Sequence, residues 1–114
     1  MEIKILVNQV TRKELAAMAA AQFGEWIKAV VDIEQGVMAI GGELHTDIRA
    51  VLLEQGSRQE NVWGINLYPE KEGEDWIEFN SMINVRPIQG NWSRGVENPA
   101  VQKKIRDVVQ RWIL

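Results

Sequence analysis

The sequence predicts a single α+β domain spanning residues 1–114, with about three helices and a mainly antiparallel sheet of about five strands. Apolar residues recur at helical spacing near both ends of the chain, and alternating apolar runs separated by turn glycines lie between them. A chain of 114 residues buries enough surface for one core without disulfides. Because the strands are expected to be joined by hairpins, an antiparallel sheet is favoured, with the helices mainly on one face.

The N-terminal region predicts a strand followed by a helix. The segment "EIKILV" (2–7) is a short apolar, β-branched run. Thr11 is a plausible N-cap, and Glu14 three residues later completes a capping box. The helix is then expected to run toward Gly24, with its apolar stripe formed by Leu15, Met18, Ala19, Gln22, Phe23 and Trp26.

A β-hairpin and an ambiguous element follow. Residues 27–34 alternate, Gln35-Gly36 supplies a tight turn, and "VMAIGG" returns. Residues 44–55 fit either a short helix or a strand, because their apolar residues match both periodicities. The helix is favoured because Gly56 is placed to end it.

The C-terminal half predicts two strands, a loop and a final helix. The strands cover 61–69 and 75–87, and each is closed by a proline. A glycine-bearing loop of about eleven residues comes next, and loops of this length are often functional. Asn98 as N-cap and Pro99 in the first turn open the last helix. Its buried stripe is expected to be Val101, Ile105, Val108, Val109, Trp112 and Ile113.

Composition excludes several function classes. With no cysteine, the chain has no disulfide, thiolate metal site or cysteine nucleophile, which fits a cytoplasmic location. The short apolar runs predict neither a signal peptide nor a membrane span. Net charge is −3, although residues 84–114 hold six basic and two acidic side chains. This basic end is either an anion-binding face or the solvated side of the last helix.

The only histidine lies in an acidic run, Glu43-x-His45-x-Asp47. A transition-metal site would need a second histidine or a cysteine, whereas a hard-ion site for Mg²⁺ or Ca²⁺ could still use Glu43 and Asp47. The favoured prediction is no metal and no other cofactor. On a strand the three side chains share one face and could serve acid–base chemistry. On a helix His45 points away from Glu43 and Asp47, which become first-turn acids. The helical, structural interpretation is favoured.

Two Ser-Arg loops form a candidate anion cradle. The sequences "GSRQEN" and "GNWSRG" combine glycine-freed backbone N–H groups with side-chain donors, and Arg86 leads into the second. The candidates are Ser57, Arg58, Arg86, Asn91, Ser93 and Arg94. The alternative is that Asn91 and Ser93 make turn hydrogen bonds. A catalytic triad of His45 with Ser57, Ser81 or Ser93 lacks any local signature. Trp92 beside Arg94 is a weak nucleic-acid signal in an acidic chain, so nucleic acid is not expected.

The five tryptophans divide into two groups. Trp26 and Trp112 lie on helical stripes and are expected in the core. Trp63 and Trp76 lie on neighbouring predicted strands, where they could pair. If exposed, they would form a face suited to a homodimer or another partner.

Three segments carry a resemblance to a known family: "VVDIEQGVMAIGGELHTD", "LLEQGSRQENVWGINLYP" and "SMINVRPIQGNWS". They resemble a small prokaryotic family of unknown function, over about residues 25–114. The matching hallmark positions are Gly41, Gly42, Glu43, His45, Asp47, Gly56, Ser57, Trp63, Gly64, Asn66, Arg86, Pro87, Asn91 and Ser93. The resemblance implies one independently folding domain and draws attention to these polar residues, but implies no activity.

Two functions are compatible with these features. The first is a cytoplasmic, non-enzymatic binding or interaction module that forms a homodimer. It follows from the absence of a complete catalytic motif and from the aromatic strands. The alternative is a small enzyme or ligand-binding protein for a phosphate or carboxylate. There, His45, Glu43 and Asp47 would meet Arg86, Asn91, Ser93 and Arg94 in one cleft, with His45 as acid–base.

Overall fold

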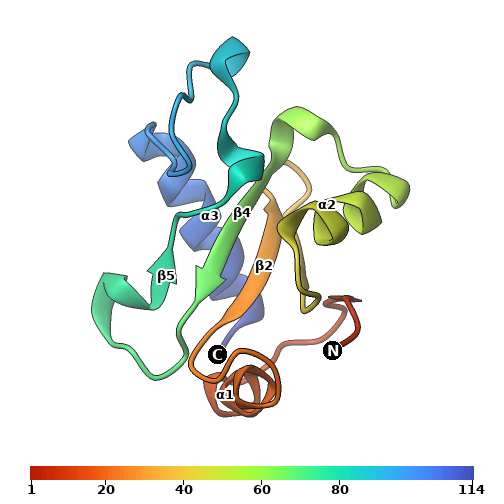
Figure 1. The fold of residues 1–114 in the computed structure, drawn as a ribbon, viewed down its shortest axis with the longest axis vertical. Helices are drawn as coiled ribbons and strands as arrows, with labels where there is room; N and C mark the ends of the chain where they lie inside the picture. The colour runs from red at the N-terminus through yellow and green to blue at the C-terminus, as the bar shows by residue number, and fades with distance from the viewer.

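The computed structural model describes residues 1–114 and confirms the α+β prediction (Figure 1). Its antiparallel sheet has the order β1-β3-β2-β4-β5. The strands are β1 (Lys4–Ile5), β2 (Ile27–Asp32), β3 (Val37–Ile40), β4 (Val62–Leu67) and β5 (Ile77–Glu78). The helices are α1 (Arg12–Ala20), α2 (His45–Glu54) and α3 (Pro99–Trp112). No helix is long and apolar enough to cross a membrane.

Two helices cover one face of the sheet and the third covers the other, so the helices lie mainly, but not only, on one face. Helices α1 and α3 pack on one face, through Leu15, Ile105 and Val109 among others. Helix α2 packs on the opposite face, where Ile48 and Leu52 meet Val30. The cause lies in β2, whose residues 29–32 are all buried rather than alternating. A strand that is apolar on both sides requires cover on both sides.

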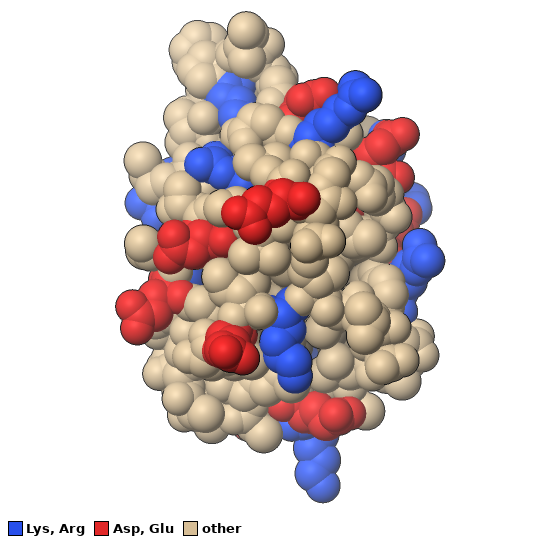
Figure 2. All heavy atoms as spheres, turned by 90° about the vertical axis from the view of Figure 1, so that its right-hand side faces the viewer, with Lys and Arg blue, Asp and Glu red and all other residues tan.

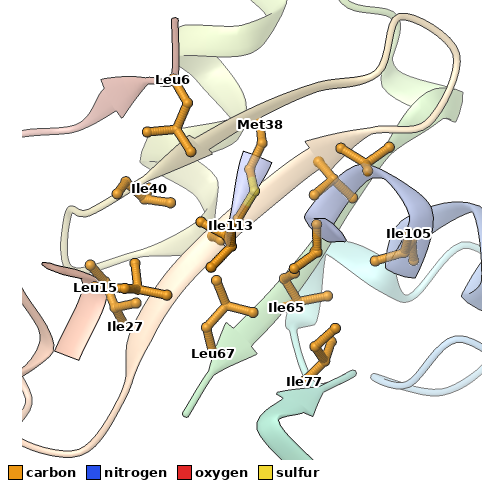
Figure 3. Packing of buried hydrophobic residues seen from close by; sticks show 14 of the residues in the cluster. Leu6, Leu15, Ile27, Met38, Ile40, Ile65, Leu67, Ile77, Ile105 and Ile113 are labelled. Carbon is orange, nitrogen blue, oxygen red and sulfur yellow. The ribbon is translucent and has the colours of Figure 1, made fainter. Parts of the chain in front are cut away.

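The larger core lies between the sheet and the α1–α3 layer (Figure 3). Side chains from four strands and two helices converge there, and each fully buried Leu or Ile contributes about 1.5–3 kcal/mol of transfer free energy. The labelled members are Leu6, Leu15, Ile27, Met38, Ile40, Ile65, Leu67, Ile77, Ile105 and Ile113. The smaller core under α2 covers only part of the opposite face, and this leaves room for polar residues there.

The helix boundaries follow their capping residues. Thr11 Oγ1 accepts from Glu14 N at 3.0 Å and Thr11 N donates to Glu14 Oε1 at 3.2 Å, which confirms the capping box. Helix α1 ends at Ala20, so its stripe is shorter than predicted. Trp26 lies beyond it, half-buried and stacked on Phe23 with ring centroids 4.4 Å apart, rather than in the core.

The later helices and the hairpin are confirmed. Asn98 caps α3, accepting from Ala100 N at 2.8 Å, and Pro99 opens it. Gly36 (φ +68°) turns β2 into β3. Helix α2 stops before Gly56, whose φ of +102° is the left-handed conformation expected just after a helix end. The ambiguous stretch 44–55 is therefore helical.

The predicted strand over 75–87 is wrong for most of its length. Only Ile77–Glu78 pairs with β4, at Asn66 and Leu67. The chain then leaves the sheet as the 79–97 segment, which contains two short 3₁₀ turns at Met82–Asn84 and Pro87–Gln89. The predicted strand over 2–7 likewise shrinks to Lys4–Ile5.

Candidate functional site

His45 is the first residue of α2, and its ring is turned into the protein. Its Nε2 lies 2.8 Å from the Ile65 carbonyl oxygen. Because a carbonyl only accepts, Nε2 carries the proton and Nδ1 is left as an acceptor. Nδ1 has no hydrogen-bond partner within the chain, and it is not sealed from solvent. Burial lowers the pKa of His45, and the charges of Lys28 and Arg94 lower it further, so the ring is neutral near pH 7.

The acids beside His45 in the sequence, Glu43 and Asp47, make no hydrogen bond with its ring. Glu43 and Asp47 are exposed, whereas His45 is 9 % exposed. No group of three or more His, Cys, Asp or Glu side chains could hold a metal ion. The helical geometry therefore separates the triplet. Ser81, one of the serines considered for a triad, is buried and makes no hydrogen bond with His45.

Two glycines near His45 lie where a side chain would clash, and Gly64 is the one that borders its ring. Gly42 has φ +76°, and a Cβ there would lie 2.8 Å from Ile3 Cγ1. At Gly64 a Cβ would lie 3.1 Å from His45 Cδ2 and 2.6 Å from Ser81 Oγ. A side chain at position 64 would displace both neighbours. The hallmark glycine of β4 thus serves close packing of the histidine ring.

Side chains, rather than a strand, complete the edge of β4 beyond β5. Asn84 Oδ1 accepts from Gly64 N at 2.8 Å, and Asn84 Nδ2 donates to Gly64 O at 2.9 Å. Arg86 donates through a terminal nitrogen to Val62 O and through Nε to Ile83 O at 2.9 Å. The Asn84 amide reproduces the two hydrogen bonds that a strand residue would make.

Arg86 and Asn91 are therefore committed inside the fold. Arg86 is 6 % exposed and stacks over Trp63 at 4.4 Å, and burial lowers its pKa to about 10. Asn91 Nδ2 donates to three carbonyls, of Asn84, Ser93 and Gly95. These donors hold the 79–97 segment together. They are not free to bind an external anion.

In the second Ser-Arg loop, backbone N–H groups bind a carboxylate of the chain itself. The backbone N–H groups of Trp92 and Ser93 donate to Glu97 Oε2 at 2.6 and 2.9 Å. These bonds lower the pKa of Glu97. In the other loop, Ser57 Oγ donates to Asp32 Oδ2 at 2.6 Å, whereas the Arg58 side chain is exposed and makes no hydrogen bond or ion pair within the chain.

The two interface tryptophans do not form an exposed pair. Trp63 is 4 % exposed and belongs to the larger core. Trp76 lies just before β5, half-buried against that core, with the Arg12 guanidinium 4.2 Å over its ring. In the β4–β5 register Leu67 faces Ile77, which places Trp63 and Trp76 far apart along the strands.

The residues that converge near His45 are a partly different set, here called the polar patch. It lies on the α2 side of the sheet, beyond the part that α2 covers. Lys28 and Asn66 are cross-strand partners on that face, and Lys28 Nζ donates to Glu43 O at 2.6 Å. The patch comprises Lys28, His45, Asn66, Glu78, Asn80 and Arg94.

Hydrogen bonds connect the members of the polar patch. Asn66 Nδ2 donates to Glu78 Oε1 at 2.8 Å and to Asn80 O at 3.2 Å. Arg94 Nε donates to Asn80 Oδ1 at 2.9 Å. His45 and Asn66 are nearly buried, while Arg94 is exposed and the other three are half-buried. One predicted anion-binding residue, Arg94, thus lies with the predicted His45.

Sequence reasoning missed Lys28, Glu78 and Asn80, and it named Asn66 only as a hallmark position of the family resemblance. Their signal was available in part, because Lys28 and Asn66 are polar positions within otherwise apolar predicted strands. The part of the sheet that stays uncovered depends on where α2 packs. No residue spacing in the sequence specifies that position. Acidic and basic side chains are interspersed over the α2 side of the molecule, so the patch is a local feature rather than part of a single-sign surface (Figure 2).

Fold and site together define an α+β domain with a sheet covered on both faces and an open polar area beside α2. A family model for proteins of unknown function, DUF5674, matches residues 4–112, and the chain belongs to that family. This confirms the resemblance seen in the sequence. Neither the curated proteins nor the solved structures include one that matches the chain.

Proposed function

We propose that the protein is a binding module whose ligand is a small anion, a phosphate or carboxylate, held at the polar patch. The observation that carries this proposal is a pair of unneutralised cations. The chain has only two ion pairs, Lys103–Asp107 and Arg106–Glu74. Lys28 and Arg94 therefore have no carboxylate partner, and both act on His45. The absence of cysteine supports a reducing compartment such as the cytoplasm.

The one acid of the polar patch is already engaged. Glu78 Oε1 accepts from Asn66 Nδ2 at 2.8 Å and lies 3.5 Å from the Tyr68 hydroxyl. Two cations against one carboxylate leave a positive balance. An anion between Lys28 and Arg94 would gain charge-assisted hydrogen bonds. Because the His45 ring is neutral, the charge that holds the anion would come from Lys28 and Arg94.

The single histidine supplies the test. Its ring signals are followed by NMR as the pH is varied, with phosphate, acetate or chloride at matched ionic strength. A bound anion stabilises the imidazolium, so phosphate or acetate should raise the pKa of His45 relative to chloride. Lys28→Met and Arg94→Met should each abolish the rise. Arg58→Met, which removes an exposed unpaired cation elsewhere, is the matched control and should leave it unchanged.

A pKa of His45 that is the same in phosphate, acetate and chloride would overturn the proposal. So would a rise that survives both patch variants, because the anion would then bind elsewhere.

A second candidate function, homodimer formation, is supported by an exposed apolar surface on the 79–97 segment. Ile88 is 98 % exposed, Trp92 71 % and Met82 65 %, and Val85 is also exposed. The segment projects at the top of Figure 1, and the summit of the same end is uncharged in Figure 2. Buried Asn84, Arg86 and Asn91 hold this surface in place, and a fixed exposed apolar surface is typical of protein interfaces.

The dimer is tested by analytical ultracentrifugation. The wild type should sediment as a dimer, and Ile88→Ser with Trp92→Ser as a monomer. Val7→Ser replaces a residue that is 80 % exposed outside this segment and should stay dimeric. A monomeric wild type, or a dimer unaffected by the double substitution, would remove this candidate.

A further inference from the structure

Two hydrogen-bond acceptors of the polar patch lack donors. Asn66 is 6 % exposed, and its Oδ1 is buried without a partner, although its Nδ2 is doubly engaged. Both partners of Nδ2 are pure acceptors, so the amide cannot be flipped to satisfy Oδ1. His45 Nδ1 also lacks a donor within the chain, but it reaches solvent, so Asn66 Oδ1 is the buried one of the two. A buried acceptor left unpaired is costly, and few such groups persist in native structures without a reason.

Lys28 is the cross-strand neighbour of Asn66. The two residues face each other across β2 and β4 on the same side of the sheet. The Lys28 ammonium donates to the Glu43 carbonyl, lies over the Phe23 and Trp26 rings at 5.4 and 5.7 Å, and has no carboxylate partner. An anion would compete with that carbonyl for the ammonium. An anion held by Lys28 would lie beside Asn66, its partner across the strands.

The charges around these acceptors select the kind of donor. Lys28 and Arg94 already disfavour a positive charge at His45. An ammonium group on a ligand would meet the same repulsion, whereas a hydroxyl would not. Resting on the proposed anion binding, we infer that the ligand carries a hydroxyl next to its anionic group: a hydroxycarboxylate or a hydroxylated phosphate ester, its anion on Lys28 and Arg94 and its hydroxyl donating to Asn66 Oδ1.

Matched ligand pairs test this inference. Affinities are measured by NMR titration for glycolate against acetate and for glycerol phosphate against propyl phosphate. In each pair the hydroxylated member should bind about tenfold tighter, because only it supplies the missing donor. Asn66→Ala should remove the preference. Asn80→Ala is the matched control: it loosens Arg94 and should weaken both members of a pair equally, with the preference kept.

The outcomes separate this inference from the proposed function. Equal affinities within each pair for the wild type would overturn the hydroxyl preference while leaving anion binding in place. Binding of neither member would overturn both. A preference that survives Asn66→Ala would assign the hydroxyl to another acceptor and overturn the role of Asn66. The comparison of ligands on the wild type does not depend on the folding of any variant.

Discussion

At the scale of single residues, the buried polar side chains of this protein act on backbone groups. Asn84, Arg86 and Asn91 engage carbonyls or N–H groups of β4 and of the 79–97 segment, and His45 engages Ile65. Three of these residues, His45, Arg86 and Asn91, looked like functional groups in the sequence. In the fold, buried Arg86 and Asn91 donate to groups of the chain itself, and His45 keeps one ring nitrogen without a partner in the chain.

The neutral, nearly buried His45 makes stability depend on pH. Its pKa in the folded chain lies below the ordinary value of 6.5. The unfolded chain therefore binds a proton first as pH falls, and the free energy of unfolding should decrease from pH 6.5 down to the folded pKa. Chemical denaturation across this range measures the effect. His45→Gln should flatten the curve there, and an unchanged slope would show that another group is responsible.

Asn84 is expected to be the most sensitive asparagine. Asn84→Ala leaves both Gly64 N and Gly64 O unpaired inside the fold, so unfolding free energy should fall by about 3–5 kcal/mol. Asn80→Ala removes a partner of the exposed Arg94 side chain and should cost less than about 1 kcal/mol. Urea denaturation of the two variants provides the comparison. Equal losses would contradict the assigned role of Asn84.

At the scale of elements, the capping and turn residues carried the most reliable information. Thr11, Gly36, Gly56 and Asn98 each mark a boundary that the structure reproduces. Such signals work because they depend on a few neighbouring residues. The strand predicted over 75–87 failed because pairing depends on a distant partner. There the side chains of Asn84 and Arg86 pair with the free backbone groups of β4, and no local sequence pattern indicates this.

Gly56 tests the local argument. Its φ is +102°, and a Cβ there would meet no atom within 4 Å. Gly56→Ala therefore adds backbone strain without a clash, and the unfolding free energy should fall by about 1 kcal/mol. Gly95 has no positive φ, and its Cβ would make only ordinary contacts at 3.5 Å. Thermal unfolding of both variants measures the difference. Gly95→Ala should be neutral or slightly stabilising, and a loss of unfolding free energy as large as that of Gly56→Ala would refute the strain argument.

At the scale of the whole molecule, the sheet is a central layer with cover on both sides. The composition and the order of elements were enough to predict its class, and the apolar stripes predicted much of the larger core. The placement of α2 on the opposite face could not be predicted, because residues 44–55 are apolar in a pattern that fits two periodicities. The polar patch follows from that placement, and this explains why Lys28 was missed and Asn66 was not assigned to a site, while His45 and Arg94 were named.

The layered architecture predicts where the molecule is most resistant to opening. Strands β2 and β4 lie at the centre of the sheet, and nearly all of their residues are buried. Their amides should exchange slowest in hydrogen-exchange measurements, with protection close to that of global unfolding. The amides of 88–90, in exposed positions, should exchange far faster. Comparable rates in the two regions would contradict a core centred on these strands.

The side-chain closure of β4 has a consequence for solubility. An unpaired strand edge is a template on which another chain can add a strand, and proteins suppress this with charges, bulges or covering elements. Here one amide and one guanidinium occupy the edge positions of Val62 and Gly64. Partial opening of the 79–97 segment would expose the unpaired backbone groups at the edge of β4. Asn84 and Arg86 therefore protect the protein from self-association into aggregates as well as from unfolding.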